Sequence, residues 1–125
     1  MMVILDTNAL MAPEQLGVDI FSELNRLGYI ECSVPTPVLR ELRHLALNEK
    51  GLDKIAAKVG LALSERCRVL EANGDADQAI EALAVAEKAA VFTNDKALKK
   101  RLSSKGVTVI YLRQGRYLEI AEKEF

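Results

Sequence analysis

The sequence predicts an α/β fold in three layers, α/β/α, with a central, mostly parallel five-stranded sheet. Short apolar runs alternate along the chain with segments whose apolar residues recur at helical spacing, which is the order of parallel β-α-β units. The predicted strands are apolar on both sides of the chain, as in a sheet covered by helices on both faces. The strands are expected at residues 3–5, 30–34, 68–70, 90–93 and 107–112.

Helices are expected between these strands, each marked by apolar residues three or four positions apart. Prolines, glycines and an Asn-Gly turn punctuate them at Gly28, Pro35, Pro37, Asn73-Gly74 and Gly106. The end of the chain, Glu122-Lys123-Glu124, is expected to be a frayed, solvated helix terminus. The expected helical segments carry the apolar sets Ile20, Leu24 and Leu27; Val38, Leu42 and Leu45; Leu52 to Leu63; Ala79, Ile80, Leu83 and Ala84; and Leu98 to Leu102.

Size and composition predict a single domain, residues 1–125, with enough apolar material for a core, because half of the residues are hydrophobic. The formal net charge of −1 excludes a global field that would attract nucleic acid or membrane, so any polyanion must bind at a local basic patch. The chain enters its first strand without a positively charged leader or a long apolar stretch, so we expect a cytosolic protein.

The cysteines and the histidine are expected to have no catalytic role. Cys32 and Cys67 are too few and too far apart for a zinc cluster, and in a reducing compartment we expect two free thiols packed as small core residues. His44 lies one turn beyond Glu41 and is expected to be a surface or hydrogen-bonding residue.

Acidic residues follow two of the predicted strands at the points where the chain leaves the sheet. Asp6 follows Ile4-Leu5, and Asp95 follows Phe92-Thr93-Asn94. If the first and fourth strands are neighbours, these carboxylates converge beyond the carboxyl ends of the strands, where doubly wound sheets bind ligands. Carboxylates held together at an apolar sheet repel one another, and Mg²⁺ or Mn²⁺ would neutralise them.

Each acid also has a plain structural interpretation. Asp77 and Asp95 stand where acids commonly cap a helix, and Glu41 lies between Arg40 and Arg43, which could pair with it. Asp6 is more specific, because it ends a buried strand and precedes Thr7 and Asn8, whose polar side chains can hold a carboxylate or a water.

Four segments in this order resemble the motifs of the PIN-domain nucleases across nearly the whole chain. In Asp75-Ala-Asp77-Gln-Ala-Ile80 the acidic position of the family falls on Asp77, because Ile80 follows it by three. Four motifs at the expected element boundaries are far more specific than one. The segments are Val3-Ile-Leu-Asp6-Thr7-Asn8, Pro35-Thr-Pro-Val-Leu-Arg-Glu41-Leu42, Asp75 to Ile80, and Val91-Phe-Thr93-Asn94-Asp95-Lys-Ala-Leu98.

The resemblance implies a divalent-metal-dependent endoribonuclease whose four acids, Asp6, Glu41, Asp77 and Asp95, form a catalytic site for Mg²⁺ or Mn²⁺. One ion or two, and a contribution from Asp75, are left open. Thr7 and Asn94 are the residues expected to orient the metal ligands, with helix capping as the alternative for Asn94. Further segments, such as 98–102 and 110–117, look like the branch associated with ribosomal RNA processing, and related archaeal sequences are similar to toxin nucleases of toxin–antitoxin pairs.

RNA is the expected partner, and a basic cluster just after Asp95 could grip its phosphates. A solvated helix face is an equally good interpretation of this cluster. With only 5% aromatic residues, base stacking offers little sequence recognition. The resemblance adds a homodimer, an antitoxin or a pre-ribosomal particle as protein partners. The expected RNA-binding residues are Lys96, Lys99, Lys100 and Arg101, with Lys105, Arg113 and Arg116 nearby.

Two other functions would each require a different pattern in the sequence. A receiver-like phosphoacceptor domain would need an aspartate after the third strand and a lysine near the end of the fifth, and neither stands there. A catalytically weak PIN-like scaffold that binds RNA in ribosome assembly would be marked by lost metal-site acids. All four acids are present, which favours an enzyme.

Overall fold

The computed structural model describes residues 1–122. Its six strands form one sheet, in the order β3-β2-β1-β4-β5-β6. Neighbouring strands are parallel except β5 and β6, which are antiparallel. The predicted fold class is therefore confirmed, and the predicted count of five strands was one too low. The strands are β1 (Met2–Leu5), β2 (Glu31–Pro35), β3 (Arg68–Leu70), β4 (Ala90–Phe92), β5 (Val109–Arg113) and β6 (Tyr117–Ile120).

The helices lie between the strands where the sequence predicted them, except that α1 was not predicted. Its buried residues Ala9, Leu10, Met11 and Ala12 are consecutive instead of three or four apart, and Pro13 lies inside it. Within residues 1–122, no helix is long and apolar enough to cross a membrane. The helices are α1 (Thr7–Leu16), α2 (Ile20–Arg26), α3 (Thr36–Asn48), α4 (Gly51–Ser64), α5 (Ala76–Glu87) and α6 (Lys96–Ser104).

The sixth strand was not predicted, and it precedes the segment where a helix terminus was expected. The turn before β6 contains Gln114 and Gly115, both with positive φ, and Ala121 continues the pairing by donating its N–H to the Val109 carbonyl. Within β6 only Leu118 is buried, so the strand carries little apolar signal in the sequence. Glu122 is not helical, and the rest of the predicted helix terminus lies outside the described residues.

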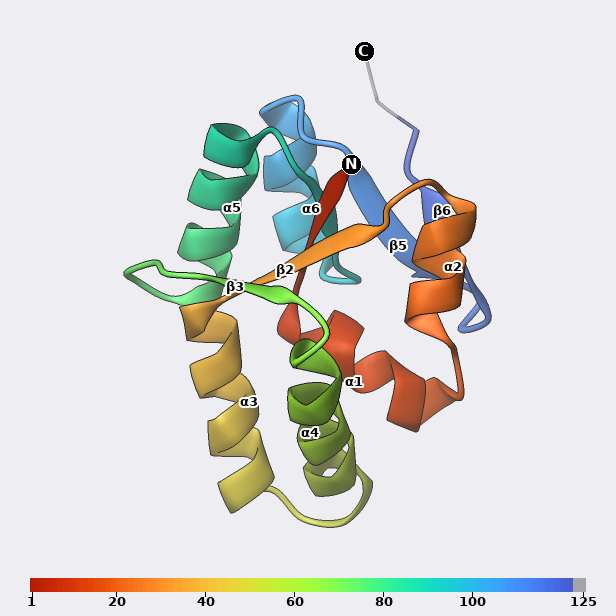
Figure 1. Cartoon of the computed structure of the whole chain (residues 1–125), viewed down its shortest axis with the longest axis vertical. Coiled ribbons are helices and arrows are strands. Elements are labelled where there is room, and N and C mark those ends of the chain that lie inside the picture. Colours follow the sequence, from red (N-terminus) through yellow and green to blue (C-terminus); the bar gives the residue numbers. More distant parts are fainter. Residues whose placement is uncertain (123–125) are drawn as a thin grey trace.

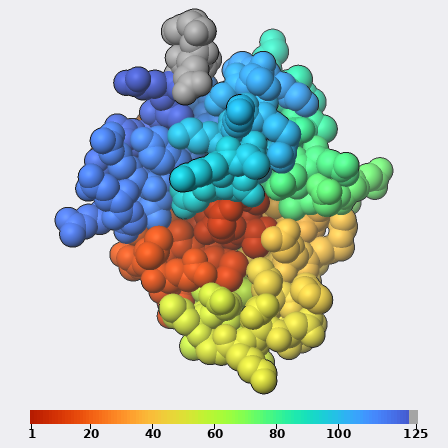
Figure 2. Space-filling view, turned by 180° about the vertical axis from the view of Figure 1, so that it is seen from behind, coloured from red at the N-terminus to blue at the C-terminus, as the bar shows by residue number. Residues whose placement is uncertain are grey.

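The sheet separates two layers of helices. Helix α2 lies over β5 and β6 in Figure 1, whereas α6 lies in the foreground when the molecule is seen from behind in Figure 2. The chain adds β2 and β3 on one side of β1 and then β4 and β5 on the other side. Because the crossovers are right-handed, the helices of these two halves are expected on opposite faces of the sheet. Fully buried side chains of β1 and β4, such as Ile4, Leu5 and Phe92, form the centre of the core.

The prediction of two free thiols was wrong. Cys32 on β2 and Cys67, just before β3, form a disulfide across 35 residues, with 4.9 Å between their Cα atoms. Both cysteines are only partly buried at the edge of the core. The parallel pairing of β2 with β3 brings the two residues together, and that pairing is not readable from the spacing of the cysteines.

Candidate functional site

The sheet topology brings two of the predicted acids to the same edge. Strands β1 and β4 are parallel neighbours, and Leu5 is paired with Phe92, so Asp6 and Thr93 emerge side by side. From this pair of strands the connections part, β2 and β3 lying on one side and β5 and β6 on the other. The condition for the two acids to converge, that the first and fourth strands are neighbours, is met. Such a switch point is where doubly wound sheets bind ligands.

Asp6 is the most enclosed of these acids, with 5% of its surface exposed. Its Oδ1 accepts a hydrogen bond from the Thr7 backbone N–H at 2.7 Å. Its Oδ2 accepts from Thr93 Oγ1 at 2.7 Å and from Asn8 Nδ2 at 3.0 Å. Burial raises the pKa of Asp6, and the charges of Asp77 and Asp95 add to the rise against the hydrogen bonds of Thr93 and Thr7. Asp6 is thus a buried carboxylate in a field of other acids.

Glu41 on α3 faces the same cluster. Partial burial raises the pKa of Glu41, and the charges of Asp6, Asp77 and Asp75 raise it further, against an interaction with the Thr7 side chain that lowers it. The Thr7 hydroxyl is buried and, among residues 1–122, has no hydrogen-bond partner of ordinary geometry. Within the same part of the chain no arginine pairs with Glu41, so the pairing alternative finds no support.

Asp75 and Asp77 have different roles at the start of α5. Asp75 is the N-cap, and its carboxylate accepts from the Gln78 N–H at 2.8 Å in a capping box. Asp77 lies within the first turn without capping it, and its Oδ2 is 3.1 Å from Arg101 Nη2 on α6. Asp77 acts on the pKa values of both Asp6 and Glu41, so its charge belongs to the cluster.

Asp95 is both a helix cap and a member of the acidic cluster. Its Oδ1 accepts from the Leu98 N–H at 3.0 Å as the N-cap of α6, as its structural interpretation predicted. Its own backbone N–H donates to Thr93 Oγ1 at 3.1 Å. The Thr93 hydroxyl therefore links the backbone of Asp95 to the carboxylate of Asp6.

Thr93 was not among the predicted site residues, although it lies in the motif that contains Asp95. Thr93 is completely buried, and its hydroxyl is the link just described. Asn94 makes no hydrogen bond to an acid within residues 1–122. Its Oδ1 accepts from the Leu112 N–H at 2.8 Å, and its N–H donates to Asn8 Oδ1 at 3.1 Å, so it ties the end of β5 to the residues after β1. The signal in the sequence that could have identified Thr93 is a polar residue placed directly after an apolar strand and two residues before an acid.

The acids converge without forming a closed coordination shell. Among residues 1–122, no three histidine, cysteine, aspartate or glutamate side chains are close enough together to hold a metal ion directly. Mg²⁺ commonly keeps several waters and takes only one or two protein carboxylates. A hydrated cation therefore fits this donor set, which is all oxygen and includes the buried carboxylate of Asp6 and the buried hydroxyl of Thr7. Figure 2 shows the red N-terminal segment meeting the amber, green and cyan segments on one face.

The basic residues after Asp95 divide between two sides of α6. Lys96, Lys99 and Lys100 line a pocket of about 550 Å³ together with Ser103, Ser104 and Glu122. Lys99 Nζ also lies 4.2 Å from the centre of the Tyr111 ring. Arg101 instead faces α5, where it pairs with Asp77 and Glu81. Three of the four predicted RNA-binding residues thus share a concave surface, and the fourth is engaged elsewhere.

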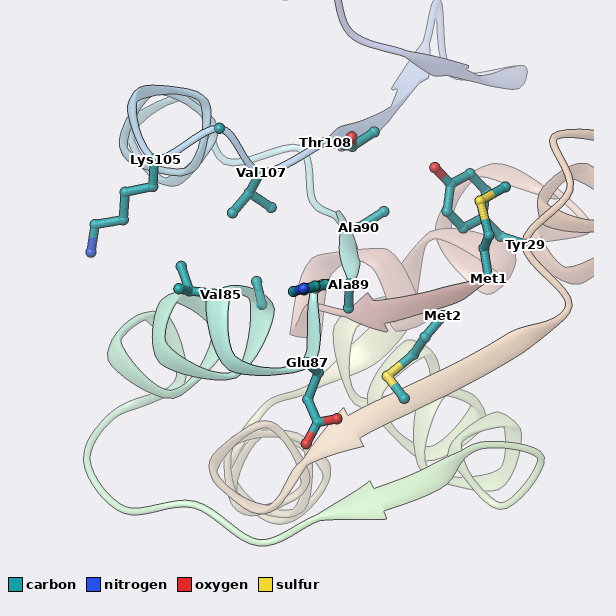
Figure 3. A pocket seen from close by; sticks show the side chains of 13 residues that line it. Met1, Met2, Tyr29, Val85, Glu87, Ala89, Ala90, Lys105, Val107 and Thr108 are labelled. Carbon is teal, nitrogen blue, oxygen red and sulfur yellow. The ribbon is translucent and has the colours of Figure 1, made fainter.

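A second pocket, of about 420 Å³, lies at the opposite end of the strands. Part of its lining comes from residues that precede or begin strands, such as Met2, Tyr29, Ala89 and Thr108, which Figure 3 labels. The end of α5 and Lys105 supply other lining residues. None of the four acids lines it. This pocket is therefore separate from the carboxyl edge at which the acids meet.

Comparison with known protein families and curated proteins agrees with this geometry. Residues 3–115 match a family model described as a PIN like domain, and this range contains all four acids. The chain is 31% identical over 111 residues to Ribonuclease VapC9 of Archaeoglobus fulgidus, covering 89% of this chain and 82% of that protein. It is 30% identical over 124 residues to Ribonuclease VapC4 of Methanocaldococcus jannaschii, covering 94% and 95%.

Solved structures share the fold over most of the chain. The PIN domain endonuclease Utp24 superposes with a TM-score of 0.77 at 25% identity, covering 98% of this chain and 92% of that one. VapBC2 from Rickettsia felis, bound to a DNA fragment from its promoter, gives a TM-score of 0.66 at 17% identity, covering 89% and 98%, which shows the fold alone. With a family match over nine-tenths of its length and two ribonuclease relatives, this chain belongs to the PIN-like domain family.

Proposed function

We propose that this protein is a divalent-metal-dependent endoribonuclease that hydrolyses RNA phosphodiester bonds with Mg²⁺ or Mn²⁺. The observation that carries the proposal is the acidic cluster at the carboxyl edge of β1 and β4. There, burial and like charges raise the pKa values of Asp6 and Glu41 together. Two relatives named as ribonucleases support RNA as the substrate.

The four acids have unequal roles in this mechanism. Asp6 and Asp95 would hold the cation, and the Thr93 hydroxyl links these two residues. Asp77 would add a third negative charge to the site. A bound Mg²⁺ or Mn²⁺ supplies positive charge to the phosphate oxygens and lowers the pKa of a bound water. Glu41 has a raised pKa and faces the cluster from α3, so it is suited to orient the attacking water by accepting its hydrogen bond.

The lysines of α6 would bind the RNA backbone. Lys96, Lys99 and Lys100 line one pocket on the helix that Asp95 caps, so phosphates held there lie next to the acidic edge. Cations on the rim are needed because both the substrate and the acids are negatively charged. Thr7, whose buried hydroxyl has no partner of ordinary geometry among residues 1–122, is suited to hold a water or ligand of the site.

The biological role is proposed from the relatives. The two relatives named as VapC ribonucleases favour a role as a cytoplasmic toxin that pairs with an antitoxin. The likeness to Utp24 favours a role in the cleavage of ribosomal RNA in a pre-ribosomal particle. A homodimer is proposed in either setting. A small antitoxin gene beside this one would favour the first role, and a setting among translation genes the second.

The test of the chemistry is cleavage of structured and single-stranded RNA in Mn²⁺, in Mg²⁺ and in a chelator. We expect cleavage with either ion and none in the chelator. We also expect Asp6→Asn to lower the rate at least 100-fold, because a neutral amide cannot replace a metal-binding carboxylate. Activity that persists in chelator, or full activity of Asp6→Asn, contradicts the mechanism.

The alternative is a catalytically weak scaffold that binds RNA in ribosome assembly. A scaffold would bind RNA through the α6 lysines and not cut it under any metal condition. Binding assays with Lys96→Gln and Lys100→Gln separate the two functions. In the proposed enzyme these changes weaken both RNA binding and cleavage, whereas in a scaffold they weaken binding while cleavage is absent in the unchanged protein.

A further inference from the structure

Arg101 joins α6 to α5 through two acids. Its Nη2 lies 3.1 Å from Asp77 Oδ2, and its Nε donates to Glu81 Oε1. One turn along α6, Lys105 Nζ lies 3.5 Å from Glu81 Oε2. Asp77 and Glu81 are themselves one turn apart on α5, so without Arg101 two like charges would face each other across that turn.

This cluster touches the acidic site at one point. Within residues 1–122, the pair of Asp77 with Arg101 is the one ion pair that includes any of the four site acids. Asp77 in turn raises the pKa values of Asp6 and Glu41 through its charge. Arg101 therefore places a fixed positive charge at the border of the site.

The guanidinium is held in place by Glu81 independently of Asp77. The Glu81 side chain is only 16% exposed, and its hydrogen bond with Arg101 keeps the pKa of the Glu81 carboxyl below its usual range. Asp77 and Arg101 are each 45% exposed, so their own pair adds little to folding stability. Asp77 can thus leave Arg101 while Arg101 stays bound to Glu81.

We propose that Arg101 is an internal counter-cation of the acidic site, a positioning residue that competes with the divalent cation for the carboxylate of Asp77. This inference rests on the proposed metal-dependent function. When no metal is bound, Arg101 neutralises one of the converging acids. A bound cation would compete with Arg101 for the carboxylate of Asp77. The Arg101 guanidinium would stay nearby, because it is also bound to Glu81, and its positive charge would repel the cation. Arg101 therefore weakens metal binding.

The experiment is a calorimetric titration of the whole protein with MnCl₂, without RNA. Arg101→Gln is expected to bind Mn²⁺ about threefold more tightly than the unchanged protein, the size of effect typical of one exposed charge. Lys105→Gln is the matched control, because Lys105 pairs with Glu81 and not with Asp77, and it should leave the affinity within about 1.5-fold of the unchanged protein. Arg101→Lys keeps the charge and should also keep the affinity.

The outcomes separate this inference from the function on which it rests. Unchanged or weaker Mn²⁺ binding by Arg101→Gln, while the unchanged protein binds Mn²⁺ and cleaves RNA, overturns the role of Arg101 alone. An equal gain in affinity in Lys105→Gln, or in Arg101→Lys, also overturns it, because the effect would then not come from a charge at Asp77. If the unchanged protein binds no Mn²⁺, the metal-dependent function fails and this inference with it.

Discussion

At the scale of single residues, the site depends on how one buried carboxylate is held. Asp6 accepts three hydrogen bonds, and those to Oδ2 come from Thr93 and Asn8. These donors fix the carboxylate in surroundings that raise its pKa. Burial and the neighbouring acids both raise the pKa of Asp6, which means that both disfavour its negative charge. A bound cation would offset both effects.

Replacing Thr93 with valine tests this arrangement. Val keeps the shape of threonine but removes the hydroxyl that serves both Asp6 Oδ2 and the Asp95 N–H. We expect Mn²⁺ affinity to fall about 10- to 100-fold and the free energy of unfolding to fall by about 1–2 kcal/mol. Thr108→Val, at the opposite end of the strands, is the matched control. Equal effects in both variants would contradict a specific role for Thr93.

Glu41→Gln tests the electrostatics through pH. The folded protein holds the Glu41 proton to a higher pH than the unfolded chain, because its pKa is raised above 4.5. Folding stability from this group therefore falls as pH rises from 4.5 through the raised value. In metal-free protein, Glu41→Gln should gain stability relative to the unchanged chain over that window, reaching about 0.5–1 kcal/mol at pH 7 after solvent screening.

The measurement is chemical denaturation of both proteins in chelator at several pH values. The gain should shrink in an Asp6→Asn background, because the charge of Asp6 is one cause of the raised pKa. A stability difference that narrows as pH rises from 4.5 to 7 is the opposite sign and contradicts this account.

The sequence predicted where the acids stand better than how they are held. The positions of Asp6 and Asp95 after two apolar strands can be read from the sequence, and the structure pairs those strands, β1 and β4, as neighbours. The double use of the Thr93 hydroxyl and the pairing of Asp77 with Arg101 depend on contacts between segments distant in the chain. Such contacts cannot be read from the sequence around either residue, because the partners are far apart in the chain.

At the scale of elements, strong periodic segments were predicted and weak ones were missed. α3 and α6 have clear apolar faces and lie where the sequence placed them. α1 has a run of consecutive buried residues, and β6 has one buried residue, so neither shows a period. Both missed elements are specified by tertiary packing instead of by local pattern.

The disulfide joins β2 covalently to the residue that precedes β3. It closes a loop of 35 residues that includes α3 and α4, so it restricts the unfolded chain. We expect reduction, or the pair Cys32→Ser and Cys67→Ser, to lower the free energy of unfolding by about 2–4 kcal/mol. Denaturant titrations with and without dithiothreitol measure this. Two reactive thiols in the unreduced native protein would contradict the disulfide itself.

At the scale of the whole molecule, the two ends of the central strands have different surroundings. The carboxyl ends of β1 and β4 carry the acids, and the amino ends border a separate pocket (Figure 3). α3, α5 and α6 each deliver one acid to the carboxyl ends, so the site exists only when the full topology has formed. Metal binding should therefore be coupled to global folding.

This coupling predicts that metal raises the thermal stability of the unchanged protein. A cation that binds only the folded state at ten times its Kd adds about 1.4 kcal/mol, which is roughly 3–6 °C in Tm for a domain of this size. Asp6→Asn should lose most of this shift. Calorimetric melts in chelator and in Mn²⁺ measure it for both proteins, with Ca²⁺ as a second hard cation. A shift of equal size in Asp6→Asn would mean that the stabilising ion binds elsewhere, because the buried carboxylate would then contribute nothing to its affinity.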